Sequence, residues 1–161
     1  MIIRKYEDKD LAKFTEFTKA SITEPVILQQ FSKDNIVNAI LTNKGNRIYV
    51  VEDDFGEIIG TGVWNTSGPT LMYALMNTPT FQLDDYMGLV SKMVTDCLAE
   101  GYDTGYIPIS QKWLLNLLQL HFPVGVKATV VGRKPITQEP LSWELEIDLN
   151  IIADRLKELS Q

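Results

Sequence analysis

The sequence predicts an α+β domain, and three patterns in it support that prediction. Two runs rich in β-branched residues, 46–53 and 57–65, flank a short turn that contains glycine, as in an antiparallel hairpin. Apolar residues recur at steps of three and four through 83–100, which predicts a long amphipathic helix. Antiparallel strands in the first half and a strand–helix–strand crossover in the middle predict a mixed, mostly antiparallel sheet with helices on both faces.

The N-terminal part supplies one strand and two helices before the hairpin. Residues 1–6 are a short β-prone run, and the EDKD that follows offers aspartates that can cap a helix. Apolar residues at helical spacing predict a helix over 8–21, which Pro25 ends. A second helix is expected over 31–43, since Gly45 stands just past its end.

The C-terminal part alternates strands with helices. The segment 142–149 is the clearest strand, because apolar residues there alternate with Glu144, Glu146 and Asp148. We expect a sheet of six to seven strands in a domain of residues 1–149, with an amphipathic helix over 150–161 packed on it. The other expected elements are strands over 70–77, 103–109 and 125–131 and helices over 111–120 and 151–160.

Composition excludes several classes of function. The 161 residues include 21 acidic and 15 basic side chains, and a net charge of −6 argues against nucleic-acid binding. No apolar run is long enough to span a membrane, and the charged N-terminus is unlike a signal peptide, so we expect a cytoplasmic protein. Cys97 and His121 are the only cysteine and histidine, which excludes an intrachain disulfide and a zinc site of the usual Cys/His type.

Three segments have an order and spacing that point to one known family. IIRKYEDKDLAKF places an arginine and then an acidic–leucine pair on the first strand and helix, and IYVVEDDFGEIIGTGVW forms an acid-rich hairpin. GYDTGYIPIS followed by WLLNLLQLHF gives a late strand and a helix that ends in phenylalanine. Over roughly residues 1–133 this resembles the GNAT-type N-acetyltransferases, which carry an acetyl group from acetyl-CoA to an amine.

The family's pyrophosphate motif, Gln/Arg-x-x-Gly-x-Gly/Ala, is degenerate in this chain. In the best fit Gly88 matches, but Asp85 replaces a cation or amide and Val90 replaces the final small residue. Asp84 and Asp85 at a helix N-terminus would repel a diphosphate and weaken its binding on the order of tenfold to a hundredfold. The resemblance implies that the coenzyme-binding residues are Leu75, Met76, Asn77, Asp85, Tyr86, Met87, Gly88, Leu89 and Val90.

The family's usual general acid is missing as well. Members often place a tyrosine five residues before the terminal phenylalanine of the late helix, to protonate the leaving thiolate. Alignment on Phe122 puts Leu117 at that position. Tyr73 on the third hairpin strand and Ser110 before the late helix are the candidate catalytic substitutes.

Two functions remain open at this point. The first is an N-acetyltransferase that uses acetyl-CoA as co-substrate and modifies a small-molecule or peptide amine. The alternative is a non-catalytic binding or assembly module with the same fold, in which Asp84 and Asp85 simply cap a structural helix.

Other reactive-looking groups have simpler interpretations. A Cys97–His121 nucleophilic pair is disfavoured, because Cys97 lies on the apolar stripe of its helix. Asp53, Asp54 and Glu57 could bind a cation or an amine, but a solvated turn is the more common role of such residues. The helix over 111–120 is apolar on nearly every side, so we expect either the C-terminal helix or a second copy in a homodimer to cover it.

Overall fold

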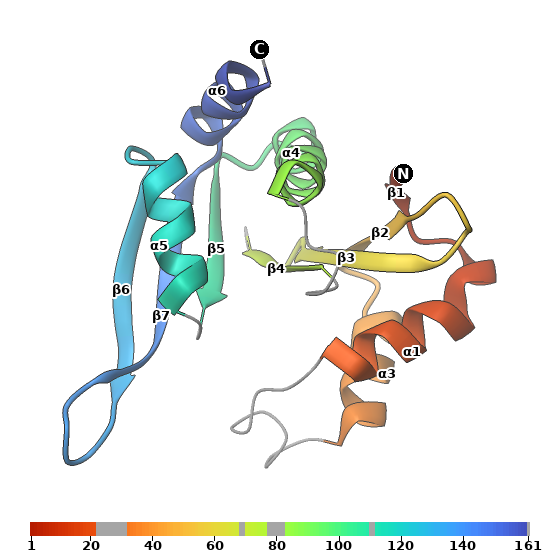
Figure 1. The fold of residues 1–161 in the computed structure, drawn as a ribbon, viewed down its shortest axis with the longest axis horizontal. Helices are drawn as coiled ribbons and strands as arrows, with labels where there is room; N and C mark the ends of the chain where they lie inside the picture. The colour runs from red at the N-terminus through yellow and green to blue at the C-terminus, as the bar shows by residue number, and fades with distance from the viewer. Residues whose placement is uncertain (22–31, 68–69, 77–82, 110–111, 161) are drawn as a thin grey trace.

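The described part of the chain forms seven strands and a set of helices in the predicted order (Figure 1). The computed structural model describes residues 1–21, 32–67, 70–76, 83–109 and 112–160. The strands are β1 (Ile2–Lys5), β2 (Asn46–Glu52), β3 (Ile58–Asn65), β4 (Thr70–Met76), β5 (Thr104–Ile109), β6 (Val126–Arg133) and β7 (Pro140–Asp148). The helices are the 3-10 turn η1 (Asp8–Asp10), α1 (Leu11–Ser21), α3 (Lys33–Thr42), α4 (Leu83–Ala99), α5 (Lys112–His121) and α6 (Leu149–Leu159).

The first sheet has the order β1-β2-β3-β4, with every neighbouring pair antiparallel. Helices α1 and α3 lie on one face of it and α4 lies on the other (Figure 1). Side chains alternate accordingly along β2, since Val50 packs with Phe14 of α1 whereas Tyr49 and Val51 belong to the core under α4. Gly62 allows α4 to approach β3 closely, because an added Cβ would lie 2.4 Å from the Met93 sulfur.

The buried face under α1 contains two hydroxyl groups without a hydrogen-bond partner. Thr18 of α1 and Thr61 of β3 are both fully buried, and no described atom accepts from or donates to their Oγ1 atoms. Thr61 pairs with Val50 and precedes Val63 by two residues, so it faces the same apolar cluster. These two groups destabilise the native state relative to an apolar side chain of the same shape.

The second sheet has the order β5-β7-β6, also antiparallel, and α5 packs on its buried face. Leu145 and Ile147 of β7 are buried while Glu144 and Glu146 are exposed, which confirms the predicted alternation. Strands β6 and β7 are longer than expected and form a projecting hairpin (Figure 1), so the predicted polar loop over 132–140 is shorter.

The two sheets meet where β4 and β5 lie side by side. The predicted crossover through α4 does place these strands next to each other. The expected single mixed sheet of six to seven strands is not confirmed, because the described strands form two separate hydrogen-bonded sheets of four and three strands. The coarser prediction, an α+β fold with helices on both faces, is confirmed.

A polar cluster holds the C-terminal half of α4 on the first sheet. The Tyr49 hydroxyl contacts both Asp96 and the Trp64 indole. Arg47 makes a bidentate ion pair with Glu100 at 2.9 and 3.1 Å and lies over the Trp64 ring. These contacts anchor α4 at the end that is remote from its first turn.

The last two helices close the core around α4. Ile152 and Leu156 of α6 are buried in the same apolar cluster as α4, and Arg155 Nε donates a 2.9 Å hydrogen bond to the His121 carbonyl at the end of α5. Leu115 and Leu118 of α5 are buried, whereas Leu120 is 73% exposed. Helix α5 therefore covers the second sheet with one side and leaves apolar surface on another; the homodimer stays a prediction.

Candidate functional site

The neighbouring edges of β4 and β5 form the most distinctive backbone feature of the molecule. β4 is hydrogen-bonded to β3 and β5 to β7, and over the described residues no ladder joins β4 to β5 although they are adjacent. Backbone N–H and C=O groups on such facing edges can bind an extended ligand that carries amides of its own. Helix α4 packs on β4 beside these strand edges (Figure 1).

The first turn of α4 provides the second part of the candidate site. Its N–H groups at Leu83, Asp84 and Asp85 are those that a helix leaves without an internal acceptor, and the helix dipole adds positive potential there. The side chain of Asp84 is exposed and that of Asp85 is half-buried. An anion at this turn would therefore have backbone donors and two carboxylates nearby.

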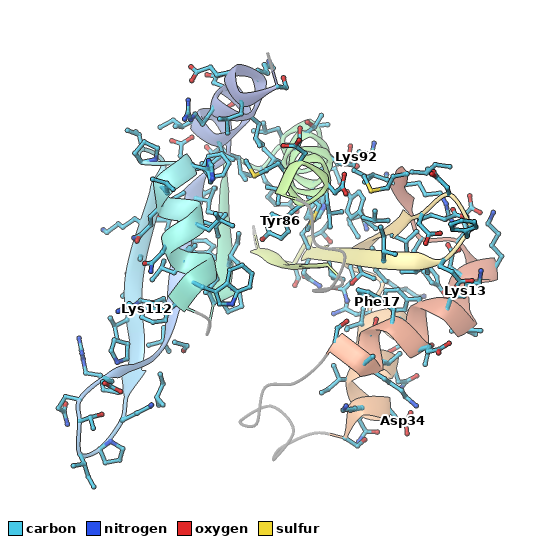
Figure 2. All side chains as sticks on the ribbon, viewed as in Figure 1. Lys13, Phe17, Asp34, Tyr86, Lys92 and Lys112 are labelled. Atoms are coloured by element: carbon cyan, nitrogen blue, oxygen red, sulfur yellow. The ribbon has the colours of Figure 1, made fainter. Side chains whose placement is uncertain are left out.

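The remaining residues of the predicted pyrophosphate motif lie inside the helix. Leu89 and Val90 are buried, and Tyr86 lies between α4 and the strands (Figure 2), where burial raises the pKa of its hydroxyl to about 12. A Cβ added at Gly88 would lie 2.9 Å from Cδ1 of Ile3. The absence of a side chain at Gly88 thus leaves room for Ile3 of β1. The neighbouring Met87 is half-buried. Of the predicted motif, Asp85 alone belongs to the first turn.

The other predicted site residues map to β4 and to segments outside the described residues. Leu75 and Met76 pair through their backbones with Thr61 and Gly60 of β3. Tyr73 pairs with Val63 in the same way, and its side chain lies outside the described part. Asn77 and Ser110 lie outside the described residues.

The cysteine and the acidic turn do not form reactive sites. Cys97 is fully buried in the core, and burial raises the pKa of its thiol to about 11, so it stays protonated at neutral pH. Asp53 accepts hydrogen bonds from the Phe55 and Glu57 N–H groups, as expected of a turn residue. Over the described residues no group of three or more acidic, cysteine or histidine side chains could hold a metal ion. No described helix is long and apolar enough to cross a membrane.

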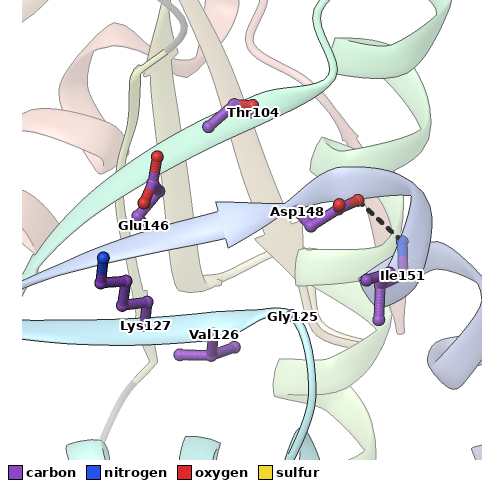
Figure 3. A pocket seen from close by; sticks show the side chains of 7 residues that line it. All are labelled: Thr104, Gly125, Val126, Lys127, Glu146, Asp148 and Ile151. Carbon is purple, nitrogen blue, oxygen red and sulfur yellow. Dashed lines mark hydrogen bonds between the residues drawn. The ribbon is translucent and has the colours of Figure 1, made fainter.

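A concavity that the sequence did not indicate lies on the second sheet. It has a volume of about 330 Å³ and is lined by polar residues that include Thr104, Lys127, Glu146 and Asp148 (Figure 3). The strand pairs Thr104–Asp148 and Lys127–Glu146 bring these side chains to one face. These residues are far apart in the sequence, so their proximity follows only from the pairing register of β5, β7 and β6.

Comparison with known proteins identifies the fold. No family model and no curated protein matches the sequence. Among solved structures, the chain is similar to an aminoglycoside 6'-acetyltransferase type Ii (TM-score 0.68, 13% identity, 92% of this chain and 97% of that one). It is also similar to a putative acetyltransferase, YncA from Salmonella typhimurium, solved with its cofactor acetyl-CoA (0.67, 18%, 92% and 94%). A third match is a point variant of spermidine N-acetyltransferase from Vibrio cholerae (0.65, 13%, 96% and 99%).

These matches extend over nearly the whole of both chains in each case. The protein therefore has the fold of the GNAT acetyltransferases, as the three sequence segments indicated. At these identities the likeness shows the fold, and activity has to be argued from the site.

Proposed function

We propose that the protein is a GNAT-type N-acetyltransferase that moves an acetyl group from acetyl-CoA to a small amine. The observation that carries the proposal is that β4 and β5 are neighbours without strand pairing between their described residues, beside the first turn of α4. The fold comparisons support it, because one matching structure contains acetyl-CoA and two others are named as acetyltransferases of spermidine and of aminoglycosides.

In this proposal the chain binds the coenzyme mainly through its backbone. Edge groups of Leu75, Met76 and Asn77 would pair with the amides of the pantetheine arm, as an added strand does. First-turn N–H groups of α4 would receive the diphosphate, and Asp85 would weaken that contact by repulsion. Backbone recognition tolerates the degenerate motif, because it does not depend on side-chain identity.

The chemistry requires an oxyanion stabiliser, a base and an acid. N–H groups on the facing strand edges would stabilise the oxyanion that forms when an uncharged amine attacks the thioester. The attacking amine must first lose a proton to a base or to water. We retain Tyr73 of β4 and Ser110 as the proposed groups that protonate the leaving thiolate.

The partners of the proposed enzyme follow from this chemistry. The acceptor is a small amine, and an acidic protein of net charge −6 attracts a cationic amine in its protonated form. Acetyl-CoA is a cytoplasmic metabolite of most cells, so we propose a cytoplasmic location. A homodimer is also proposed, in which the second copy would cover the exposed apolar side of α5 around Leu120.

Ligand-induced stabilisation tests the proposal directly. The full chain is heated with and without millimolar acetyl-CoA, at low and at moderate salt, because a ligand that binds only the native state must raise Tm. Desulfo-CoA, which keeps the diphosphate and pantetheine but cannot carry an acetyl group, serves as the binding control. Release of free thiol in the presence of a panel of polyamines and aminoglycosides then reports transfer. An unchanged Tm at both salt concentrations would contradict acetyl-CoA binding and with it the proposed reaction.

A further inference from the structure

Tyr86 is a buried tyrosine near the start of α4, with 6% of its surface exposed. It belongs to the apolar cluster that α4 shares with Ile109 of β5 and Leu115 of α5. The chemistry proposed above assigns no role to its hydroxyl group. A buried hydroxyl beside a proposed active site is a candidate for a functional group, provided that its position agrees with the reaction.

The contacts of α4 show which strand Tyr86 faces. A Cβ added at Gly88 would lie 2.9 Å from Ile3 of β1. One added at Gly62 of β3 would lie 3.3 Å from Leu89. Successive helix residues are about 100° apart, so Tyr86 lies about 60° beyond Leu89 on the side away from Gly88. In the sheet order β1-β2-β3-β4, the next strand in that direction is β4. Tyr86 therefore points past β3, toward β4 and the neighbouring β5 (Figure 2).

Tyr86 also lies on the path proposed for the coenzyme. It is the fourth residue of α4, directly after the three first-turn N–H groups that would receive the diphosphate. From there the pantetheine arm would run between β5 and β4, the strand on which α4 packs. The sulfur at the end of the arm would thus pass the side of the strands on which Tyr86 lies.

Strand β5 presents apolar groups on the same side. Ile107 and Ile109 face the cluster around α4 and α5, whereas Tyr106 between them pairs with the exposed Glu146 and faces the opposite side. On α4 itself, Val90 follows one turn later and is buried. A thiolate that forms here would be poorly solvated, and a hydrogen bond to it is strongest in such surroundings.

We propose that the Tyr86 hydroxyl donates a hydrogen bond to the sulfur of acetyl-CoA as the thioester breaks. This role rests on the proposed acetyltransferase function and adds a catalytic residue to it. The amine nitrogen bonds to the acetyl carbon, the carbon–sulfur bond breaks, and its electron pair stays on sulfur. The nitrogen then loses its surplus proton, and the thiolate gains one from Tyr73 or Ser110, as proposed above.

The acid strength of Tyr86 suits a hydrogen-bond donor. Burial raises the pKa of its hydroxyl to about 12, whereas a thiol has a pKa of about 8.5. The phenol therefore keeps its proton at neutral pH and stabilises the thiolate without giving that proton up. A hydrogen bond to the charged form of an acid lowers the pKa of that acid. Tyr86 should therefore make the thiol of bound CoA more acidic.

The pKa of the bound thiol tests this role, because a purely structural tyrosine would leave it unchanged. CoA enriched in carbon-13 at the carbon next to sulfur is bound to the full chain, and its NMR shift is followed against pH. We expect the thiol pKa to be about one unit higher in Tyr86→Phe than in the wild type, since one charge-assisted hydrogen bond is lost.

Transfer kinetics and a matched variant complete the test. Tyr86→Phe should lower kcat about tenfold with an unchanged KM for acetyl-CoA, because the hydrogen bond strengthens only as sulfur leaves. Tyr102→Phe is the control. It removes a hydroxyl that donates a 2.7 Å hydrogen bond to the Thr66 carbonyl, beyond the other end of α4. It should change neither the thiol pKa nor kcat.

A second variant keeps the test independent of folding. The Tm of Tyr86→Phe shows whether that protein folds, and 3-fluorotyrosine at position 86 keeps both ring and hydroxyl while making the hydroxyl a stronger donor. The fluorinated protein should lower the thiol pKa further. If CoA binds and neither change at Tyr86 moves the thiol pKa, the role of Tyr86 is wrong while coenzyme binding stands. If CoA does not bind the wild type, the acetyltransferase proposal fails together with this role.

Discussion

The Tyr49 hydroxyl donates a 2.8 Å hydrogen bond to the Asp96 carboxylate, which joins the middle of β2 to the C-terminal half of α4. The same hydroxyl accepts a 3.0 Å hydrogen bond from the Trp64 indole N–H. Burial is the main cause that raises the pKa of Tyr49 well above its ordinary value. The phenol therefore stays protonated at neutral pH and can serve both partners.

Removal of this hydroxyl should be costly, because it leaves a buried indole N–H and a carboxylate without their shared partner. We expect Tyr49→Phe to lower the free energy of unfolding by about 2 kcal/mol. Urea denaturation measures the change. Tyr106→Phe is the matched control, since its hydroxyl is 3.5 Å from Glu146 at an exposed position, and it should cost less than about 0.5 kcal/mol. Similar losses in both variants would contradict the role assigned to the buried cluster.

The ion pair between Arg4 and Asp10 should make the stability of the protein depend on pH. Asp10 is 6% exposed, and Arg4 contacts it through two hydrogen bonds of 2.7 and 2.8 Å. The hydrogen bond from Arg4 is the main cause that lowers the pKa of Asp10 below its ordinary value. A depressed folded-state pKa stabilises the protein above the unfolded-state pKa, and this contribution is lost as pH falls through the folded-state pKa.

We therefore expect Asp10→Asn to destabilise the protein by about 2 kcal/mol at neutral pH and by progressively less below about pH 4. Denaturant titrations between neutral pH and pH 3 measure the difference between the two proteins. Asp8→Asn, at an exposed position of the same turn, should show no comparable pH dependence. A destabilisation of Asp10→Asn that is constant with pH would show that charge pairing is not its cause.

The unpartnered hydroxyl of Thr61 predicts a stabilising substitution. Thr61→Val keeps the shape of the side chain and removes a buried group without a hydrogen bond, so stability should rise by about 1 kcal/mol. Thr66→Val is the contrasting variant, because the Thr66 hydroxyl donates a 2.9 Å hydrogen bond to the Gly45 carbonyl. That variant should lose about 1 kcal/mol. A loss of stability in Thr61→Val, measured by urea denaturation, would mean that its hydroxyl is satisfied in solution.

The negative charge of Asp85 should weaken the binding of a diphosphate at the first turn of α4. Asp85→Asn removes one repulsive charge and should tighten acetyl-CoA binding about three- to tenfold at low salt. The gain should shrink at high salt because of screening. Isothermal titration calorimetry measures both affinities. Asp34→Asn, in the first turn of α3, is the matched control and should change nothing. An unchanged affinity for Asp85→Asn would place the diphosphate away from this turn.

Local patterns in the sequence predicted most of the fold. Alternation identified β7, and Gly101 was expected to end the long helix. It lies two residues after the last helical residue, Ala99, with a φ of +96°. The division into two sheets was not predictable, because it depends on which backbone edges meet and not on the side chains of β4 or β5. The element order alone is the same for one sheet or two.

The candidate site was less predictable than the fold. The motif alignment placed Gly88 on the long helix, and its coenzyme role stays a prediction; the alignment could not show that a side chain at Gly88 would meet Ile3. Tyr86 is a polar residue by type, yet it is 6% exposed. Pairings such as Thr104 with Asp148 join residues far apart in the chain, so no local spacing indicates them. The burial of Tyr86 and the pairing of Thr104 with Asp148 both depend on how the strands and helices pack in three dimensions.

The fully buried Trp64 gives the protein an internal optical probe. Its indole lies between the first sheet and α4, with the Tyr102 ring edge-on at 5.8 Å. Trp113 and Trp143 instead belong to α5 and β7 around the second sheet. With those two changed to phenylalanine, indole emission would report when α4 separates from the first sheet. Comparison with the far-ultraviolet signal would then reveal whether the two halves unfold as one cooperative unit.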